Sequence, residues 1–222
     1  MQITRWKEFP TVAALRDAAI KAVLDAASIA IAARGRFDVV LAGGTTPRDI
    51  YHVLRSAQTD WACWHIWYGD ERCLPADDSE RNSKMAQDVW LNHVAIPVAQ
   101  IHPMPTELGA QAAVASYNQA LSGVGDFDLV LLGIGEDGHT ASLFPGHAWE
   151  GNTPTIAVSN APKPPSDRVS LTASRLSQAR QVLFIVTGSN KREAVQQWRS
   201  GAALPVAAIA PQAGVDVFLC LQ

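Results

Sequence analysis

The segment GIGEDGHTAS (133–142) holds the residues of this sequence best suited to catalysis. Asp137 and His139 lie two positions apart in a glycine-rich turn that follows the apolar run 127–135. An imidazole titrates near neutral pH, and a neighbouring carboxylate can orient the ring and stabilise its protonated form. A loop histidine on its own is more often a surface or capping residue. The strand end and the carboxylate favour the catalytic interpretation, with His139 as general base and Asp137 as its support.

The same turn matches the glycine spacing of a dinucleotide-binding loop, with Gly133, Gly135 and Gly138 in the pattern G-x-G-x-x-G. That loop normally opens the first β-α turn of its fold, whereas several strand-like runs precede residue 133. The acidic residue that should follow about 20 positions later is missing, since TIAVSN stands at 155–160. We therefore expect no dinucleotide site and no cofactor.

An anion site is predicted at GGTTPRD (43–49), where an apolar run leads through two glycines to a helix start. Glycines let the backbone approach a ligand, and the free N–H groups of a first helical turn attract negative charge. Gly43, Gly44, Thr45 and Thr46 are the candidates. The alternative is a plain turn capped by Thr46. The loop is not a Walker A motif, because no G-K-[ST] follows.

Three basic residues follow or open strand-like runs and are candidates for binding an anionic substrate. Lys191 stands near the start of a helical pattern, where a cation does not help the helix dipole and an anion would explain it. Arg168 opens the run RVSLT (168–172), and an arginine can bind phosphate in a bidentate manner. Arg72 leaves the run 64–72 together with Asp70 and Glu71. Solvated surface side chains remain the alternative for each.

Metal and serine chemistry are not indicated. His139 has no second histidine at helical spacing, and the other histidines form no ligand pattern. No G-x-S-x-G sequence is present. We expect a metal-free mechanism.

The elements that must position these residues alternate between strand and helix. Helices are predicted at 12–33, 81–93, 107–122 and 190–199, with a further helix starting at Thr46–Pro47, and strands at 37–44, 64–72, 127–135, 155–159, 168–172, 181–188 and 215–221. Residues 145–167 are rich in Pro, Asn and Gly and are predicted to be mainly loop. Such alternation predicts an α/β fold with a mostly parallel sheet and helices on both faces.

Ligands of such sheets bind beyond the carboxyl ends of the strands. The polar segments 43–48, 69–72, 133–142 and 187–192 all follow predicted strands. We therefore expect them to converge on one site.

Length and composition narrow the partners. The 222 residues suit a single domain over 1–222, and the formal net charge of −3 argues against a nucleic-acid-binding surface. No apolar run approaches the length of a membrane span. Three cysteines, Cys63, Cys73 and Cys220, without a C-x-x-C pair favour a reducing compartment. We expect a cytoplasmic monomer that acts on a small molecule.

Several segments together resemble the 6-phosphogluconolactonase family, in the superfamily that also holds glucosamine-6-phosphate deaminases and ribose-5-phosphate isomerases. The matching segments are LAGGTTPRDIY (41–51), WYGDERCLP (67–75), RNSKMA (81–86), LVLLGIGEDGHTASLFPG (129–146), RVSLT (168–172) and GSNKREA (188–194). They occur in the family's order and span most of the chain.

The resemblance implies a three-layer Rossmann-like fold and hydrolysis of 6-phospho-D-glucono-1,5-lactone to 6-phosphogluconate in the pentose phosphate pathway. His139 matches the family's proposed general base and Asp137 its neighbour. Residues 43–46 match the sugar-phosphate loop, and Arg72, Arg168 and Lys191 match basic residues that face the substrate. The oxyanion donor is either Arg72 or the backbone N–H groups of the glycine turn. The role of Asn82 is left open, because SERNSKMA departs from the family's usual D-S-N.

Phe144 separates this sequence from the deaminases that it otherwise resembles. Those proteins resemble DGHIAFNEP here, with a glutamate five residues after the histidine that helps ring opening. Phe144 at that place favours ester hydrolysis. The alternatives are a deaminase-like enzyme or sugar-phosphate isomerase, and a non-catalytic sugar-phosphate sensor.

Overall fold

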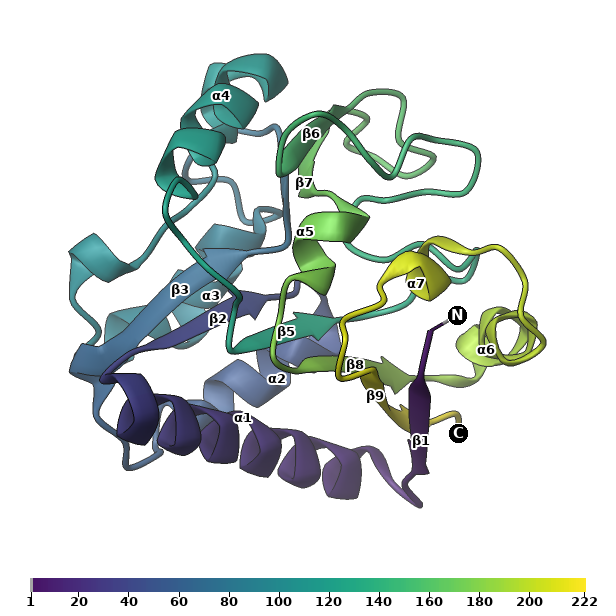
Figure 1. The fold of residues 1–222 in the computed structure, drawn as a ribbon, viewed down its shortest axis with the longest axis horizontal. Coiled ribbons are helices and arrows are strands. Elements are labelled where there is room, and N and C mark those ends of the chain that lie inside the picture. Colours follow the sequence, from purple (N-terminus) through teal and green to yellow (C-terminus); the bar gives the residue numbers. More distant parts are fainter. Residues whose placement is uncertain (1) are drawn as a thin grey trace.

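The largest feature of the fold is a six-stranded sheet (Figure 1). The computed structural model describes residues 2–222. The strand order is β1-β9-β8-β5-β2-β3, and every neighbouring pair is parallel. The strands are β1 (Thr4–Glu8), β2 (Phe37–Leu41), β3 (Trp64–Tyr68), β5 (Leu129–Leu132), β8 (Val182–Thr187) and β9 (Val215–Cys220). The predicted α/β fold with a mostly parallel sheet is confirmed.

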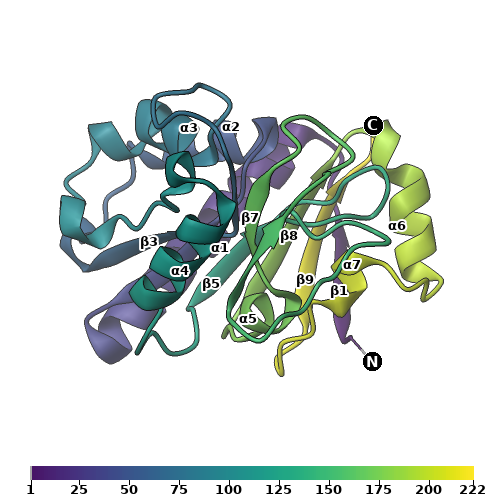
Figure 2. The ribbon, with the colours of Figure 1, turned by 90° about the horizontal axis from the view of Figure 1, so that it is seen from above.

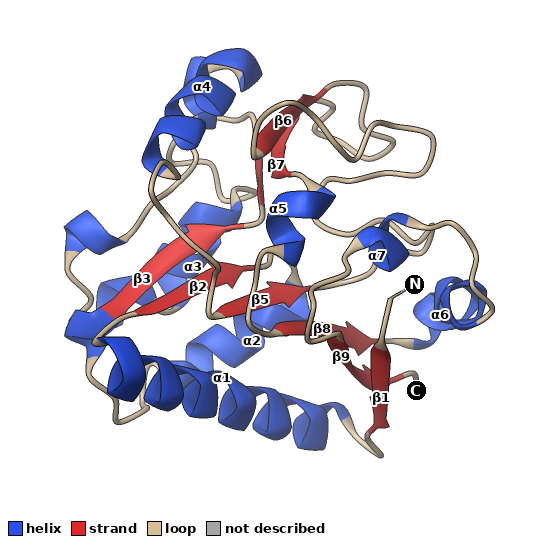
Figure 3. Ribbon diagram, in the orientation of Figure 1, coloured by secondary structure: helices blue, strands red, loops and turns tan. Residues whose placement is uncertain are grey.

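Helices lie on both sides of this sheet (Figure 3). In Figure 1, α1 (Val12–Arg34) and α2 (Thr45–Leu54) lie below it, and α5 (Ala173–Ser177) and α7 (Pro205–Ala208) lie above it. The view from above in Figure 2 places α6 (Arg192–Arg199) at one end of the molecule and α3 (Asn82–Val89) and α4 (Ala110–Ala120) toward the other. Among residues 2–222, no helix has the length and apolar character needed to cross a membrane.

A second, antiparallel sheet forms part of the upper layer. Its strands are β4 (Asp70–Arg72), β7 (Arg168–Leu171) and β6 (Thr155–Val158), in that order. The predicted strand 64–72 is therefore two strands, divided at Gly69. Strands buried on both faces in parallel sheets are continuously apolar. The mixed sequences DER and RVSL suit antiparallel pairing instead.

Local signals explain the boundaries of the helix α1. The Thr11 side chain accepts a hydrogen bond from the Ala14 N–H at its start, and Gly35 ends it with φ 66°. The strand β1 was not predicted, because its sequence TRWKE is mostly polar. Polar residues are common in a strand at the edge of a sheet, which is where β1 lies.

The strand order creates a switch point between β2 and β5. From β2 the chain continues to β3 at one edge, whereas β5 leads to β8 and β9 on the other side. Connections that diverge in this way leave a crevice at the carboxyl ends of the two strands, and ligands bind there in open α/β sheets. Val39 and Leu131 are fully buried in the sheet, so this edge of the site rests on a rigid core.

Candidate active site

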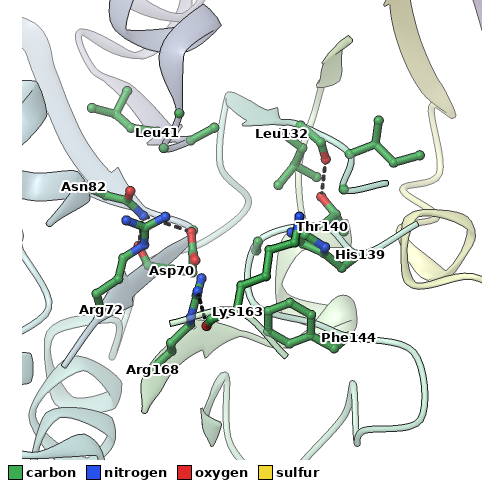
Figure 4. Close-up of a pocket in the computed structure, with 18 of the residues that line it drawn as sticks. Leu41, Asp70, Arg72, Asn82, Leu132, His139, Thr140, Phe144, Lys163 and Arg168 are labelled. Carbon is green, nitrogen blue, oxygen red and sulfur yellow. Dashed lines mark hydrogen bonds between the residues drawn. The ribbon is translucent and has the colours of Figure 1, made fainter. Parts of the chain in front are cut away.

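A cavity of about 400 Å³ opens at this switch point (Figure 4). It is lined by Leu41, Ala42, Gly43, Gly44, Gly69, Asp70, Arg72, Asn82, Leu132, Gly133, Ile134, Gly135, His139, Thr140, Ala141, Phe144, Lys163, Pro164, Arg168 and Lys191. Segments after β2, β3, β5 and β8 all contribute, as the sequence predicted. The floor consists of backbone and apolar side chains at the strand ends, and the walls carry charged side chains.

The turn after β5 holds the predicted base. His139 Nδ1 lies 2.5 Å from Asp137 Oδ1, and the His139 backbone N–H also donates to that oxygen at 3.2 Å. Because the carboxylate accepts, the neutral ring carries its proton on Nδ1 and leaves Nε2 as a base. A Cβ on Gly135 would lie 1.9 Å from His139 Nδ1, so only glycine leaves room for the imidazole.

Burial and charge set the protonation of this pair. Burial lowers the pKa of His139. The hydrogen bond and charge of Asp137 act in the opposite direction, but burial is the larger effect and the pKa lies below its ordinary value. Burial raises the pKa of Asp137, but the hydrogen bonds and charge of His139 more than offset that increase. At neutral pH the pair is therefore an imidazole supported by a carboxylate, which is the state that a general base requires.

Phe144 forms the apolar wall behind the imidazole. Its fully buried ring lies 4.7 Å from the His139 ring, centroid to centroid. The Trp149 indole N–H donates to the Phe144 carbonyl at 2.7 Å, which fixes this part of the chain. The wall excludes water from one side of the ring and supplies no acid.

The glycine loop after β2 contributes backbone to the cavity, whereas its threonine side chains lie outside the lining. Gly44 precedes the first helical residue of α2 with φ 103°, and no side chain within residues 2–222 caps the start of this helix. The Thr46 hydroxyl instead lies 2.6 Å from the Thr187 hydroxyl at the end of β8. The alternative of a turn capped by Thr46 is wrong. The bond places the start of α2 beside the turn that carries Lys191.

Arg72 and Arg168 are direct partners across β4 and β7. Like charges in such a pair are destabilising unless an anion lies nearby. Figure 4 shows both head groups close to the carboxylate of Asp70. Arg72 donates to the Glu80 carbonyl at 2.5 Å, and its buried Nε has no hydrogen-bond partner among the residues that the structure describes.

Arg168 is more occupied than Arg72. It donates to the backbone carbonyls of Lys163, Pro164 and Pro165 at 2.9, 3.2 and 3.1 Å. Burial lowers its pKa, an effect that the charge of Asp70 opposes. Its main contacts therefore hold the loop that carries Lys163.

Two lysines reach the cavity from different segments. The Lys191 side chain is mostly buried, and this burial lowers its pKa. Lys163 extends from its loop toward His139 in Figure 4. Lys163 was not predicted as a site residue, because a lysine between two prolines in a predicted loop carries no local signal of a site.

Asp70 and Asn82 are further polar residues of the cavity. Asp70 is buried and accepts hydrogen bonds from the Ser142 hydroxyl at 2.6 Å and the Asn82 side-chain amide at 3.1 Å. A Cβ on Gly43 would lie 2.0 Å from Asn82 Oδ1, so the glycine loop packs directly on this amide. Asn82 therefore links Asp70 to the glycine loop.

Glu71 lies between two cavity residues yet serves another role. Successive side chains of a strand point to opposite faces. Glu71 is fully buried and accepts the N–H groups of Asn82 and Ser83 at the start of α3, at 2.7 and 2.8 Å. Glu71 thus supports the α3 helix that carries Asn82.

Comparisons with known proteins give one consistent result. Residues 10–218 match the family model described as glucosamine-6-phosphate isomerases/6-phosphogluconolactonase. A 6-phosphogluconolactonase of Mycobacterium leprae is 39% identical over 201 residues, which cover 83% of this chain and 80% of that protein. The structure of a 6-phosphogluconolactonase from Thermotoga maritima has a TM-score of 0.92 and 25% identity, covering 97% of this chain and 99% of that one. The corresponding values for the Trypanosoma brucei 6-phosphogluconolactonase are 0.86, 27%, 99% and 96%.

Proposed function

Because the chain belongs to the family of glucosamine-6-phosphate isomerases and 6-phosphogluconolactonases, we propose that it hydrolyses 6-phospho-D-glucono-1,5-lactone to 6-phospho-D-gluconate. This reaction belongs to the pentose phosphate pathway. The observation that carries the proposal is the contact between His139 Nδ1 and Asp137 at the edge of a cavity rich in cations. Opening a lactone ring requires one base and a place for a developing negative charge.

His139 acts as the general base in this proposal. Its Nε2 takes a proton from water, and the water oxygen bonds to the lactone carbonyl carbon. The tetrahedral intermediate then breaks its bond to the ring oxygen, which receives the proton from the imidazolium. Asp137 holds the ring and stabilises its positive charge during these steps. A positioned base typically accelerates such a reaction by roughly 10²–10⁴-fold.

Arg72 is the oxyanion donor that we favour. Its side chain lines the cavity, and the only hydrogen bond of its guanidinium among residues 2–222 goes to the Glu80 carbonyl, so its other N–H groups can bind a developing charge. Two of the competing donors in the glycine turn are engaged. The Gly135 N–H donates to the His139 carbonyl and the Gly138 N–H to the Gly135 carbonyl.

The substrate phosphate binds between the start of α2 and the two lysines in this proposal. The contact between Thr46 and Thr187 brings the glycine loop beside the segment of Lys191. We add Lys163 to the set inferred from sequence. Arg168 then supports the phosphate site mainly through its hydrogen bonds to the Lys163 loop.

Ester hydrolysis is favoured over the deaminase reaction by the wall behind the base. The apolar ring of Phe144 packs against His139. The deaminase-like sequences have a glutamate at the position of Phe144. A sensor without catalysis would not need a base whose pKa is held below its usual value.

The decisive experiment follows decay of freshly prepared lactone, coupled to 6-phosphogluconate dehydrogenase, with the spontaneous rate subtracted. We expect His139→Ala to lose most of the turnover, at least about 100-fold, while binding of 6-phosphogluconate persists, because the base acts in the transition state. Asp137→Asn should do milder damage, since the imidazole remains. Near wild-type turnover in His139→Ala would show that His139 is not the base.

A further inference from the structure

Glu136 joins three segments at the mouth of the cavity. Its Oε1 accepts a hydrogen bond from the Asn190 side-chain amide at 2.6 Å and lies 4.0 Å from Lys191 Nζ. Its Oε2 lies 3.9 Å from Lys163 Nζ. Both lysines line the cavity, whereas Glu136 stands outside the lining and is half exposed. The carboxylate thus competes with any anion for the same two ammonium groups.

Product formation changes the charge that these lysines face. Hydrolysis adds water across the acyl–oxygen bond, giving a hydroxyl and a carboxylic acid that loses its proton at neutral pH. The phosphate carries about −1.5 to −2 charge. The product therefore carries about one negative charge more than the lactone. A cavity lined by Arg72, Lys163, Arg168 and Lys191 would hold it more strongly than the substrate.

We propose that Glu136 weakens the binding of the phosphate by Lys163 and Lys191, and that this helps the more highly charged product to leave. This inference rests on the proposed hydrolysis of a phosphorylated lactone. The proposed role and a purely structural role predict opposite changes in anion affinity when Glu136 is replaced. If Glu136 only held the lysines in place, its loss would weaken anion binding. If it competes for them, its loss strengthens that binding.

The test compares Glu136→Gln with the wild-type enzyme. Glutamine can still accept the hydrogen bond from Asn190 but carries no charge. The matched control is Glu193→Gln, which removes the same charge from the first turn of α6, where Glu193 accepts a hydrogen bond from Gln197. Titration calorimetry measures the dissociation constants of 6-phosphogluconate and of gluconate at low ionic strength, and the melting temperature checks the fold.

We expect Glu136→Gln to bind 6-phosphogluconate about three- to tenfold more tightly, as the loss of two weak charge pairs, each with a half-exposed carboxylate, allows. The affinity of Glu136→Gln for gluconate should stay within about twofold of the wild-type value. The affinity of the Glu193→Gln control for 6-phosphogluconate should also stay within about twofold of wild type. The inhibition constant of 6-phosphogluconate in the turnover assay should fall by the same factor. The gain should disappear when Lys163 and Lys191 are both replaced by alanine, since a cycle of variants isolates the coupling.

Unchanged or weaker product binding in a folded Glu136→Gln variant would overturn this inference and leave the lactonase proposal standing, provided that the wild-type enzyme turns over the lactone. Failure of the wild-type enzyme to turn over the lactone or bind 6-phosphogluconate would overturn both.

Discussion

At the residue scale, the protonation of His139 predicts the pH dependence of the reaction. Burial lowers its pKa below the ordinary value of 6.5, the charges of Asp137 and Asp70 oppose this decrease, and that of Lys163 adds to it. A lowered pKa keeps the base unprotonated to more acidic pH. We expect kcat/KM to be flat near neutrality and to fall as the pH drops through a value below 6.5. A pH–rate profile, corrected for spontaneous hydrolysis at each pH, checks this.

The same pH–rate profile measured for Asp137→Asn tests whether His139 is the group that produces the acidic limb. Asparagine removes the charge that raises the pKa of His139, so the acidic limb should move to still lower pH while the plateau falls. An acidic limb at the same pH in both proteins would assign that limb to another group.

Lys191 gives a second prediction at this scale, about substrate choice. A remote charged group anchors the sugar, and its binding energy is used at the reacting carbon. A charge-assisted hydrogen bond contributes about 1.5–3 kcal/mol. Lys191→Ala should therefore lower kcat/KM for the phosphorylated lactone by about tenfold to a hundredfold and hardly affect plain gluconolactone. Equal losses on both substrates would contradict the phosphate assignment.

At the scale of elements, the short strand β4 serves the cavity and the core at once. Asp70 and Arg72 line the cavity, while Glu71 between them accepts two backbone N–H groups at the start of α3. Arg81 lies 3.6 Å from the Glu71 carboxylate and is itself buried. One side chain therefore couples the position of the strand to that of the helix.

Glu71→Ala should reduce the free energy of unfolding by about 3 kcal/mol, because removing one partner leaves a buried charge and backbone donors without their acceptor. Urea unfolding measures this. Glu80→Ala is the control, since the exposed Glu80 contributes its backbone carbonyl to Arg72 and that group is retained. If Glu71→Ala lost no more unfolding free energy than Glu80→Ala, the buried carboxylate would contribute no more to stability than an exposed one.

At the scale of the whole molecule, one crevice gathers residues from both sheets. β2 and β5 supply its floor, and the antiparallel sheet supplies Asp70, Arg72 and Arg168. Because neither sheet forms the cavity without the other, we propose that the chain is a single domain.

Chelation tests the chemistry of this site as a whole. Within residues 2–222, no group of three or more His, Cys, Asp or Glu side chains is arranged to hold a metal ion. We expect turnover to persist after treatment with EDTA and dialysis, with the untreated enzyme measured in parallel. Lost activity that one divalent cation restores would contradict the metal-free mechanism.

The sequence by itself determined the local chemistry of this protein. Asp137 and His139 meet because they lie two residues apart in one turn, and the glycines of that turn leave room for the ring. The parallel sheet was predictable because continuous apolar runs between helices have few other ways to be buried. Convergence of the strand ends followed from the same topology.

Only the tertiary structure decided which distant side chains join that turn. Asp70 was grouped with Glu71 and Arg72 as a charged strand exit, and pairing of β4 with β7, nearly a hundred residues later, buries it beside Arg168. Lys163 enters the cavity because Arg168 holds its loop. Such contacts depend on the register between segments far apart in the chain. The alternation of buried and exposed residues restricts the register within a strand pair, but it does not show which distant strand is the partner.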